Sequence, residues 1–295
     1  MKIGLVGLGL VGTALAARLK AAGFEVIGLD VRPPACEAFA AAGGQLATSL
    51  PAMAAQTSCV LLAVFDTQGV LDVVEGKAGI VNDVAGGLVG GTVRSFIDCS
   101  TGDPDVLQAL AQRLKARGID FIEAPLSGSS IQIAEGAATM LLGGEADAIA
   151  AHASVLQALA TQRLHVGPAG MGARAKLATN LVLGLNRAAL AEGLVFAERM
   201  GIAPAQFLQL VLSTPARSDA AAIKGPLMVS DSFAPQSRVR QHLKDVDLML
   251  ESARLAGQKL PLSETHAALM RAAVAAGDGE LDNAAIVRQL RRETF

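Results

Sequence analysis

Residues 2–12, KIGLVGLGLVG, decide the fold of the first half of the chain. A short apolar run leads into the glycine pattern G-x-G-x-x-G, and residues 13–22, TALAARLKAA, continue with the periodicity of a helix. Gly23 ends that helix, and a second apolar run over 25–29 stops at an acid, Asp30. The stretch therefore predicts a strand, a tight turn, a helix and a second, parallel strand.

The glycines of this turn have separate mechanical roles. Gly7 allows the tight turn, Gly9 lets the backbone approach a pyrophosphate, and Gly12 lets the helix pack closely on the strand. The helix N-terminus then holds the anion, while Asp30 accepts hydrogen bonds from a ribose. A glycine-rich turn without function would lack this context of strand, helix and acid, so the stretch predicts dinucleotide binding. The expected cofactor residues here are Gly7, Leu8, Gly9, Leu10, Val11, Gly12, Asp30, Val31 and Arg32.

The choice between NAD and NADP depends on the residues that follow the second strand. Arg32, just beyond that strand, could accommodate the 2'-phosphate of NADP. A carboxylate at the ribose would repel this phosphate, so Asp30 favours NAD. We expect NAD as the cofactor, with NADP as the alternative and Arg32 as a solvated residue if NAD is bound.

Composition and charge exclude several classes of function. Hydrophobic residues make up 52% of the 295 residues and charged residues 18%, which is typical of a well-packed globular protein. The formal net charge of -2 provides no basic field for a nucleic acid or an acidic membrane surface. The three cysteines are widely spaced and odd in number, which favours free thiols over a metal site. We expect a cytoplasmic protein with no membrane span, no metal and no nucleic-acid partner.

The length and the order of the apolar runs predict two domains. Further strand-like runs lie at 59–64, 95–98 and 119–123. They alternate with helical stretches such as 104–117, which predicts a doubly wound, mostly parallel α/β sheet. After His165 the chain reads as helix, and residues 181–195 are apolar on nearly all sides, which predicts a buried helix. We therefore expect a Rossmann domain over residues 1–166 and an all-α domain over residues 167–295.

A second group of polar residues lies in the segment 170–180, GMGARAKLATN. Lys176 and Asn180 are four residues apart and share one face of the predicted helix, which Gly184 and Arg187 continue. A buried Lys or Asn needs polar partners, because an unpaired buried charge is costly. The alternative is that Lys176 simply reaches solvent at the start of the helix.

Four motifs in this order resemble the β-hydroxyacid dehydrogenase family, which includes 3-hydroxyisobutyrate dehydrogenases and tartronate semialdehyde reductases. They are 7–12 (GLGLVG), 123–129 (EAPLSGS) with 135–139 (EGAAT), 170–180, and 244–257 (KDVDLMLESARLAG). The resemblance spans nearly the whole chain. It implies hydride transfer between a nicotinamide cofactor and a small 3-hydroxy acid, or its semialdehyde or keto acid. Phosphogluconate dehydrogenases resemble the same motifs, with a similar NAD-binding part, but carry a much longer helical C-terminal region.

The resemblance implies a role for each matching residue. Lys176 would be the catalytic general acid/base, and Asn180 would position the substrate hydroxyl. Ser127 and Gly128 would bind the substrate carboxylate, with Ser129 beside them. Without the resemblance, Ser127 would be interpreted as an ordinary loop hydroxyl. The other residues expected near the cofactor are Val64, Phe65, Thr101 and Lys244.

Three residues depart from the family pattern. Ser129 stands where the family usually has a second Gly, and Glu251 replaces the more usual Asp. Both put the identity of the substrate in doubt, whereas Val11 in place of the common Met should be harmless. A second anionic group of the substrate could bind one of several cations, each of which could equally be solvated. These cations are Arg217, Lys224, Arg238 and Arg240.

Two other functions fit the same fold. An imine reductase is the enzyme alternative, although imine-reducing relatives generally lack Lys at the position of Lys176. A non-catalytic dinucleotide-binding scaffold would be expected to lose Lys176, Asn180 and Lys244, all of which are present. The chain contains no Tyr, which excludes the Tyr-Lys pair of short-chain dehydrogenases. The apolar helical second domain favours a homodimer or a homotetramer.

Overall fold

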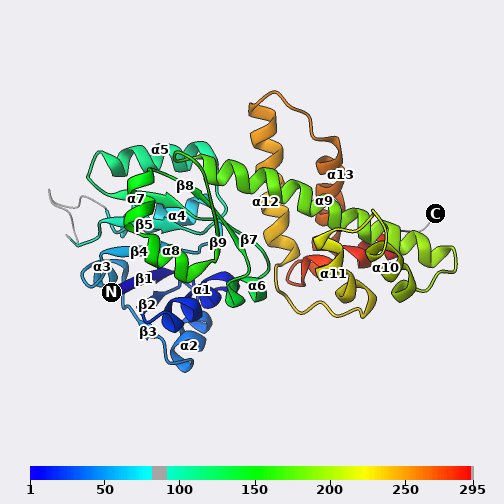
Figure 1. Cartoon of the computed structure of the whole chain (residues 1–295), viewed down its shortest axis with the longest axis horizontal. Coiled ribbons are helices and arrows are strands. Elements are labelled where there is room, and N and C mark those ends of the chain that lie inside the picture. The colour runs from blue at the N-terminus through cyan, green and yellow to red at the C-terminus, as the bar shows by residue number, and fades with distance from the viewer. Residues whose placement is uncertain (82–91, 294–295) are drawn as a thin grey trace. The chain divides into compact units, whose positions relative to one another are not determined.

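The computed structural model describes residues 1–81 and 92–293, and their contacts divide the chain into two compact units. The first unit comprises Met1–Lys176 and the second Leu177–Phe295. The division falls inside one continuous helix, α9 (Met171–Arg199), whereas the domain boundary predicted from the sequence lies in front of this helix. Figure 1 labels most of the elements of both units.

A nine-stranded sheet forms the centre of the first unit. The strands in the order β3-β2-β1-β4-β5-β6 are parallel, and β8 then pairs antiparallel with both β6 and β7. β9 pairs in parallel with β8. The strands are β1 (Lys2–Val6), β2 (Glu25–Leu29), β3 (Gln45–Leu46), β4 (Cys59–Leu62), β5 (Ser95–Asp98), β6 (Asp120–Glu123), β7 (Leu126–Ser127), β8 (Thr139–Gly143) and β9 (Gln162–Gly167).

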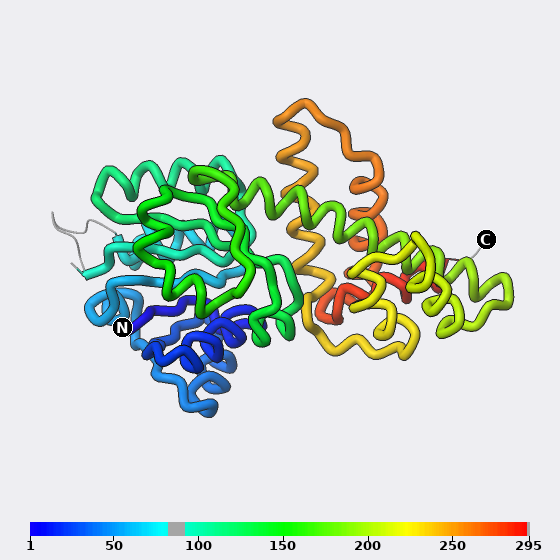
Figure 2. The backbone as a smooth tube through the Cα atoms, in the orientation of Figure 1, coloured from blue at the N-terminus to red at the C-terminus, as the bar shows by residue number. Residues whose placement is uncertain are grey.

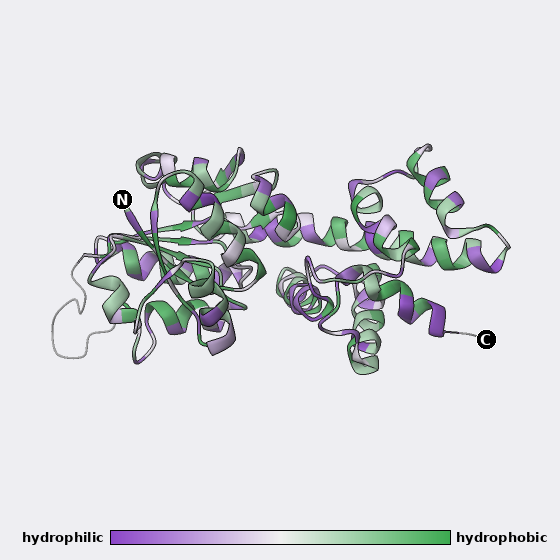
Figure 3. Cartoon of the chain, turned by 90° about the horizontal axis from the view of Figure 1, so that it is seen from below, coloured by the Kyte–Doolittle hydropathy of each residue, from purple (hydrophilic) through white to green (hydrophobic). Residues whose placement is uncertain are grey.

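Two hydrophobic clusters cover the two faces of this sheet. Leu61 and Ile97 belong to one cluster, whereas their neighbours in the sequence, Leu62 and Phe96, belong to the other. Figure 3 shows the hydrophobic residues along these strands. All residues of β4 and β5 are buried, as expected for parallel strands covered on both faces. The helices of this unit are α1 (Leu10–Ala21), α2 (Pro33–Ala41), α3 (Leu50–Ala54), α4 (Thr67–Val74), α5 (Pro104–Lys115), α6 (Ser130–Glu135), α7 (Ala146–Ala151) and α8 (Ala153–Leu159).

The predicted mostly parallel α/β sheet is confirmed, but the sequence did not reveal its last part. β7 has only two residues, too few for a periodic pattern. β9 is largely exposed and therefore lacks the apolar run that marks a buried strand. β8 is a buried apolar run of five residues, but the sequence analysis recorded only its first residue, as the end of the 135–139 motif, so the part of the sheet beyond β6 was absent from the prediction.

The second unit is helical, as predicted, and Figure 2 shows the path of its backbone from green to red. Its hydrophobic cluster is built from α9 and from the helices that follow it. After α9 the elements are α10 (Pro204–Leu212), α11 (Asp219–Val229), α12 (Val239–Leu255), α13 (Pro261–Ala273), the π-helical turn η1 (Val274–Asp278), the 3-10 turn η2 (Asn283–Ala285) and α14 (Ile286–Arg292).

Helix α9 is buried on one face only. Leu190 and Leu194 lie in the core, but Val182 is 58% exposed and Phe196 is 63% exposed. The prediction of a helix buried on all sides is therefore wrong, because other segments of the chain cover only one of the apolar faces of α9. By length and composition alone α9 could cross a membrane, with 39% of the tested window buried. A core helix passes the same test, and the inner face of α9 packs in the hydrophobic cluster of its unit.

Candidate active site

The turn after β1 has no room for side chains at two of its glycines. Gly7 has φ +96°, and a Cβ there would collide with the carbonyl of Ala63. A Cβ at Gly12 would collide with the carbonyl oxygen of Gly7. Only glycine therefore allows the tight turn at Gly7 and the close start of α1 at Gly12. This geometry agrees with the roles expected for both residues.

The first turn of α1 is open to an anion. Gly9 is the N-cap, and no side chain in the described part of the chain caps the helix or places an acid in its first turn. The atom nearest to a Cβ built on Gly9 is Arg32 Nη2, at 3.5 Å, so the backbone there is not covered closely. The amide groups of a helix N-terminus without a side-chain cap suit a phosphate. The turn therefore fits the pyrophosphate of a dinucleotide.

Asp30, at the carboxyl end of β2, is held by two neighbours. Its carboxylate accepts hydrogen bonds from the Leu8 amide at 2.7 Å and from the Arg32 amide at 2.9 Å. The Arg32 guanidinium donates to both carboxylate oxygens at 3.0 Å. Burial alone would raise the pKa of Asp30, but the hydrogen bonds from Arg32 and Leu8 hold it below its usual value. The two residues on which the cofactor choice depends thus form one ion pair.

Four more positions expected to contact the cofactor lie in the segments that follow β2, β4 and β5. Val64 and Phe65 come after β4, and the Val64 amide donates to the Ser100 hydroxyl at 3.1 Å. Thr101 comes after β5, directly beyond Ser100. Phe65 is 47% exposed, and Val31 after β2 is 97% exposed. All of them lie at the carboxyl ends of parallel strands, where open α/β sheets bind ligands.

The expected carboxylate-binding loop begins at Ser127, which is partly exposed. Gly128 has φ +156°, and a Cβ there would stand 2.9 Å from the Cβ of Ala138, so glycine is required. Ser129 is the N-cap of α6. Its hydroxyl accepts from the Gln132 amide at 3.3 Å, and its amide donates to Gln132 Oε1 at 2.8 Å. The departure at Ser129 therefore forms a capping box, which engages its polar groups within the loop.

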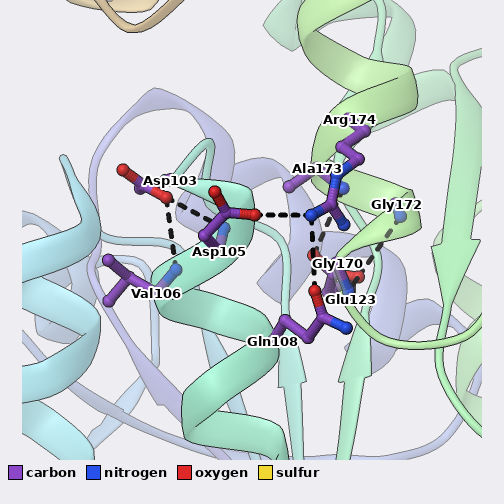
Figure 4. A network of polar contacts seen from close by, with 9 residues as sticks. All are labelled: Asp103, Asp105, Val106, Gln108, Glu123, Gly170, Gly172, Ala173 and Arg174. Carbon is purple, nitrogen blue, oxygen red and sulfur yellow. Dashed lines mark hydrogen bonds and ion pairs between the residues drawn. The ribbon is translucent and has the colours of Figure 1, made fainter. Parts of the chain in front are cut away.

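Glu123, at the end of β6, caps the N-terminus of α9 (Figure 4). Its carboxylate accepts hydrogen bonds from the amides of Gly170 at 2.6 Å and of Gly172 and Ala173 at 3.2 Å. Burial raises the pKa of Glu123 to about 7, although these hydrogen bonds oppose the shift. The sequence indicated Glu123 only as the first residue of a motif. Its capping role depends on a contact between distant segments that no local pattern indicates.

A second set of contacts joins the first turn of α9 to α5 (Figure 4). The Arg174 guanidinium donates to the Asp105 carboxylate and to Gln108 Oε1. Asp103 in turn caps α5 by accepting from the amides of Asp105 at 2.9 Å and Val106 at 3.2 Å. The beginning of α9 is therefore fixed by hydrogen bonds from two elements of the first unit.

Lys176 lies in α9 close to the expected carboxylate-binding loop. Its Nζ donates to the carbonyl oxygen of Leu126 at 2.6 Å, and Leu126 directly precedes Ser127. Lys176 is only 8% exposed, so the alternative in which it simply reaches solvent is wrong. The first unit thus contains both a dinucleotide-type turn and a buried amine beside a polar loop.

Two residues expected in the active site, Asn180 and Lys244, contact the same carboxylate in the second unit. Asn180, on α9, donates from Nδ2 to Asp245 Oδ2 at 3.3 Å. Lys244 Nζ lies 2.9 Å from the other oxygen of Asp245, on α12. Asp245 thereby links Asn180 and Lys244, although the sequence analysis gave Asp245 no role. The available signal was an acid directly after Lys244 in the fourth motif.

Three of the four cations that could bind a second anionic group of the substrate already pair with carboxylates of this chain. One interpretation from the sequence was that Lys224 is solvated. Instead it is only 6% exposed, and its Nζ lies 2.9 Å from Asp282 Oδ2. Arg238 and Arg240 both pair with Glu280, at 3.1 and 3.2 Å. These pairs leave the three cations less suited to binding a substrate anion.

The other two departures from the family pattern have local explanations. Glu251 is exposed and pairs with Arg254 at 2.6 Å, so its longer side chain lies on the surface of α12. Val11 is partly buried and packs against a hydrophobic cluster of the first unit. The doubt that Glu251 cast on the substrate therefore has no support in its contacts.

Both units match known protein families. Residues 2–167 match the model described as the NAD binding domain of 6-phosphogluconate dehydrogenase. Residues 170–290 match the model described as the NAD-binding part of NADP-dependent 3-hydroxyisobutyrate dehydrogenase. The chain belongs to the β-hydroxyacid dehydrogenase family. The two matches confirm the resemblance that the four motifs indicated. This β-hydroxyacid dehydrogenase is an NAD(P)-dependent oxidoreductase.

Relatives of this β-hydroxyacid dehydrogenase align over almost the entire chain. L-threonate dehydrogenase of Cupriavidus necator is 30% identical over 97% of this chain and 95% of its own length. 2-Hydroxy-3-oxopropionate reductase of Escherichia coli is 29% identical over 98% of this chain and 97% of its own length. A crystal structure of 3-hydroxyisobutyrate dehydrogenase from Salmonella typhimurium superposes with a TM-score of 0.84, at 26% identity, covering 98% of this chain and 99% of that one. The similarity therefore includes both units.

Proposed function

We propose that this β-hydroxyacid dehydrogenase oxidises a small 3-hydroxy acid, or reduces the corresponding semialdehyde or keto acid, with NAD as the preferred cofactor. The hydrogen bond between Lys176 and Leu126 carries the proposal, because it holds a buried amine beside the Ser127 loop. The names of the relatives, L-threonate dehydrogenase and 2-hydroxy-3-oxopropionate reductase, support the substrate class. The retained Lys176 argues against both the imine reductase and the scaffold alternatives.

The first unit would hold the cofactor. The open N-terminus of α1 would bind the pyrophosphate, and Asp30 would accept hydrogen bonds from the ribose. Arg32 must turn away for this, and the ribose hydroxyls would then replace its hydrogen bonds to the Asp30 side chain, which is only 5% exposed. The Arg32 side chain is 56% exposed, so it can move into solvent. A 2'-phosphate would instead face the Asp30 carboxylate, which is why we propose NAD.

The protein supplies proton transfer and orientation. When bound, the nicotinamide supplies the hydride acceptor for oxidation and the hydride donor for reduction. In oxidation Lys176 Nζ accepts the proton of the 3-hydroxyl, so the amine must be neutral when it acts; in reduction the ammonium returns that proton. The Leu126 carbonyl fixes Nζ at the loop that would bind the substrate carboxylate.

The second unit supplies orienting groups. Asn180 would position the substrate hydroxyl through its amide, which adds no charge. Asp245 accepts a hydrogen bond from that amide and lies beside Lys244, so it limits the orientations of both side chains. Lys244, from the same motif, would lie near the nicotinamide.

Steady-state turnover of a panel of 3-hydroxy acids with both cofactors tests the proposal. We expect NADH formation with at least one 3-hydroxy acid, and a higher kcat/KM with NAD than with NADP. A tenfold preference for NADP would overturn the cofactor assignment. Binding of NADH without turnover of any 3-hydroxy acid or corresponding aldehyde would favour the scaffold instead.

We also propose that the protein is a cytoplasmic homodimer or homotetramer. Val182 and Phe196 are exposed on α9 and are separated by nearly whole helical turns. Met200, directly after this helix, and Leu210 of α10 are exposed as well. Exposed apolar residues gathered in this way suit self-association. Light scattering after gel filtration should give a dimer or tetramer for the wild type and a smaller species for Phe196→Glu. A monomeric wild type would contradict the proposal.

A further inference from the structure

A buried cation in the second unit has no role in the mechanism above. Arg187 is 3% exposed, and its Nε and Nη2 have no hydrogen-bond partner among the residues that the structure describes. Burial lowers the pKa of Arg187 to about 10, so its guanidinium stays charged at neutral pH. A methionine or leucine would fill this position without the cost of a buried charge.

The carboxylate whose charge acts on Arg187 is already committed to other partners. Asp282 is fully buried and pairs with Lys224 Nζ at 2.9 Å. The same carboxylate accepts hydrogen bonds from the amides of Gln236 at 2.9 Å and Ser237 at 3.1 Å. Two buried cations therefore share one buried anion. An uncompensated buried charge of this kind is expensive, and a ligand of opposite charge would balance it.

Two histidines adjoin the unbalanced charge. His266 is 3% exposed, its Nε2 has no hydrogen-bond partner in the described ranges, and its ring lies 5.3 Å from that of His242. Gly184 makes room for both rings, since a Cβ there would stand 2.5 Å from His242 Nε2 and 3.1 Å from His266 Cε1. Burial and the charge of Arg187 lower the pKa of His266 to about 4, so its ring is neutral and can donate one hydrogen bond.

The position of Arg187 on α9 relates it to the substrate. Asn180, Gly184 and Arg187 share the buried face of this helix. The charge of Arg187 acts on His266, whose Cε1 would stand 3.1 Å from a Cβ at Gly184, so this charge acts at about the level of Gly184. That level is about one turn, or roughly 5.4 Å, beyond Asn180. A group bound there would be a few covalent bonds from a hydroxyl positioned by Asn180.

We propose that Arg187, assisted by His266, binds a second anionic group of the substrate, either a carboxylate or a phosphate. The proposal rests on the proposed function and narrows it, because it selects 3-hydroxy acids that carry two anionic groups. A guanidinium matches a carboxylate or a phosphate with two parallel hydrogen bonds, and Arg187 has unpartnered N–H groups for them. This assignment replaces the surface and paired cations considered from the sequence.

Three matched substrates test the proposal: 3-hydroxybutyrate, 3-hydroxyglutarate and 3-hydroxy-4-phosphobutyrate. The first has one anionic group, and the others add a carboxylate or a phosphate to the same skeleton. The wild type should use one of the dianions with a kcat/KM roughly 10- to 100-fold above that for 3-hydroxybutyrate, the range expected for hydrogen bonds to charged groups. The better of the two dianions identifies the anionic group.

Arg187→Met should remove this preference while changing kcat/KM for 3-hydroxybutyrate less than threefold, and Arg187→Lys should restore part of it. Arg254→Met is the matched control, because Arg254 is exposed and pairs with Glu251 on the surface. It should keep the preference. An unchanged preference in Arg187→Met, or a wild type that prefers 3-hydroxybutyrate, would overturn the proposal while leaving the proposed function intact.

A binding readout separates the proposal from the proposed function. Glutarate, but not butyrate, should raise the Tm of the wild-type protein, and the effect should disappear in Arg187→Met. The Tm of the free Arg187→Met protein checks that the variant folds, and removal of an unbalanced buried charge should leave it equal or higher. Equal effects of glutarate on wild type and variant would refute the proposal even if none of the three hydroxy acids is turned over.

Discussion

Glu123→Gln should change the pH dependence of stability, because Glu123 is buried as the cap of α9. Its pKa is raised to about 7 by burial, whereas an unfolded glutamate titrates near 4.5. The folded state therefore holds the proton more tightly than the unfolded state does. The stability contribution of Glu123 is greatest below about pH 4.5 and declines until the pH passes about 7.

The size of this effect follows from the difference between the two pKa values. It corresponds to about 3 kcal/mol of unfolding free energy lost by the wild type across the window. Glutamine keeps a carbonyl acceptor for the α9 amides but cannot ionise. The stability of Glu123→Gln relative to the wild type should therefore rise by about this amount between pH 5 and pH 8, or roughly 6–12 °C in Tm for a unit of this size.

Differential scanning calorimetry of both proteins at several pH values measures the effect. Glu135→Gln is the control, since Glu135 is exposed at the end of α6 and should show the pH dependence of the wild type. Parallel Tm curves for Glu123→Gln and the wild type would show that ionisation of Glu123 does not change the stability of the fold. They would mean that the helix amides stabilise the Glu123 carboxylate enough to cancel its burial.

Three further experiments test the cofactor choice, the glycine turn and a buried ion pair. Asp30→Ser should raise the ratio of kcat/KM with NADP to that with NAD by roughly 10- to 100-fold, since it removes a charged acceptor at the ribose; an unchanged ratio would mean that Asp30 does not contact the cofactor. Gly12→Ala should lower the Tm and abolish NADH binding, because its Cβ would collide with the Gly7 carbonyl. Gly9→Ala should keep the Tm and raise only the Kd for NADH. Equal losses of Tm in the two variants would contradict this. Asp282→Asn should destabilise the second unit by about 3–5 kcal/mol in urea unfolding, because it leaves a buried Lys without its counter-ion, and a loss below about 1 kcal/mol would show that the pair contributes little.

The parallel part of the sheet could be predicted because its main strands are short apolar runs, the first two of which end at recognisable residues. Gly7 ends the first run and Asp30 follows the second, and both residues have the surroundings that this pattern implies. The local sequence also contained the glycine spacing that leaves α1 without a side-chain cap. These features depend on neighbours in the sequence, which is why they could be deduced.

Other features depend on contacts between distant residues and could not be predicted. The Glu123 cap of α9, the Lys176 contact with Leu126, and the link through Asp245 all join separate segments. The roles of Lys176 and Asn180 came from the resemblance to a family rather than from the spacing. The exposed side of α9 was misjudged because apolar residues indicate burial without showing which protein surface covers them.

Lys176→Ala tests whether Lys176 transfers the proton. Because positioned acid/base groups contribute typically about 10²–10⁴ in rate, kcat should fall by that factor. The Kd for NADH should stay nearly unchanged, since the dinucleotide would be held by the turn at Gly7–Gly12. NADH fluorescence can report this Kd with little protein background, because the chain contains no Trp and no Tyr.

Single-turnover and steady-state oxidation of a 3-hydroxy acid by wild type, Lys176→Ala and Lys176→Arg complete the measurement. We expect Lys176→Arg to rescue poorly, because a guanidinium stays protonated and cannot act as a base. If Lys176 transfers the proton, both variants should lose most of their kcat while keeping an intact fold and an unaltered Kd for NADH. Near-wild-type oxidation by either variant would contradict it and show that the proton leaves the substrate by another route.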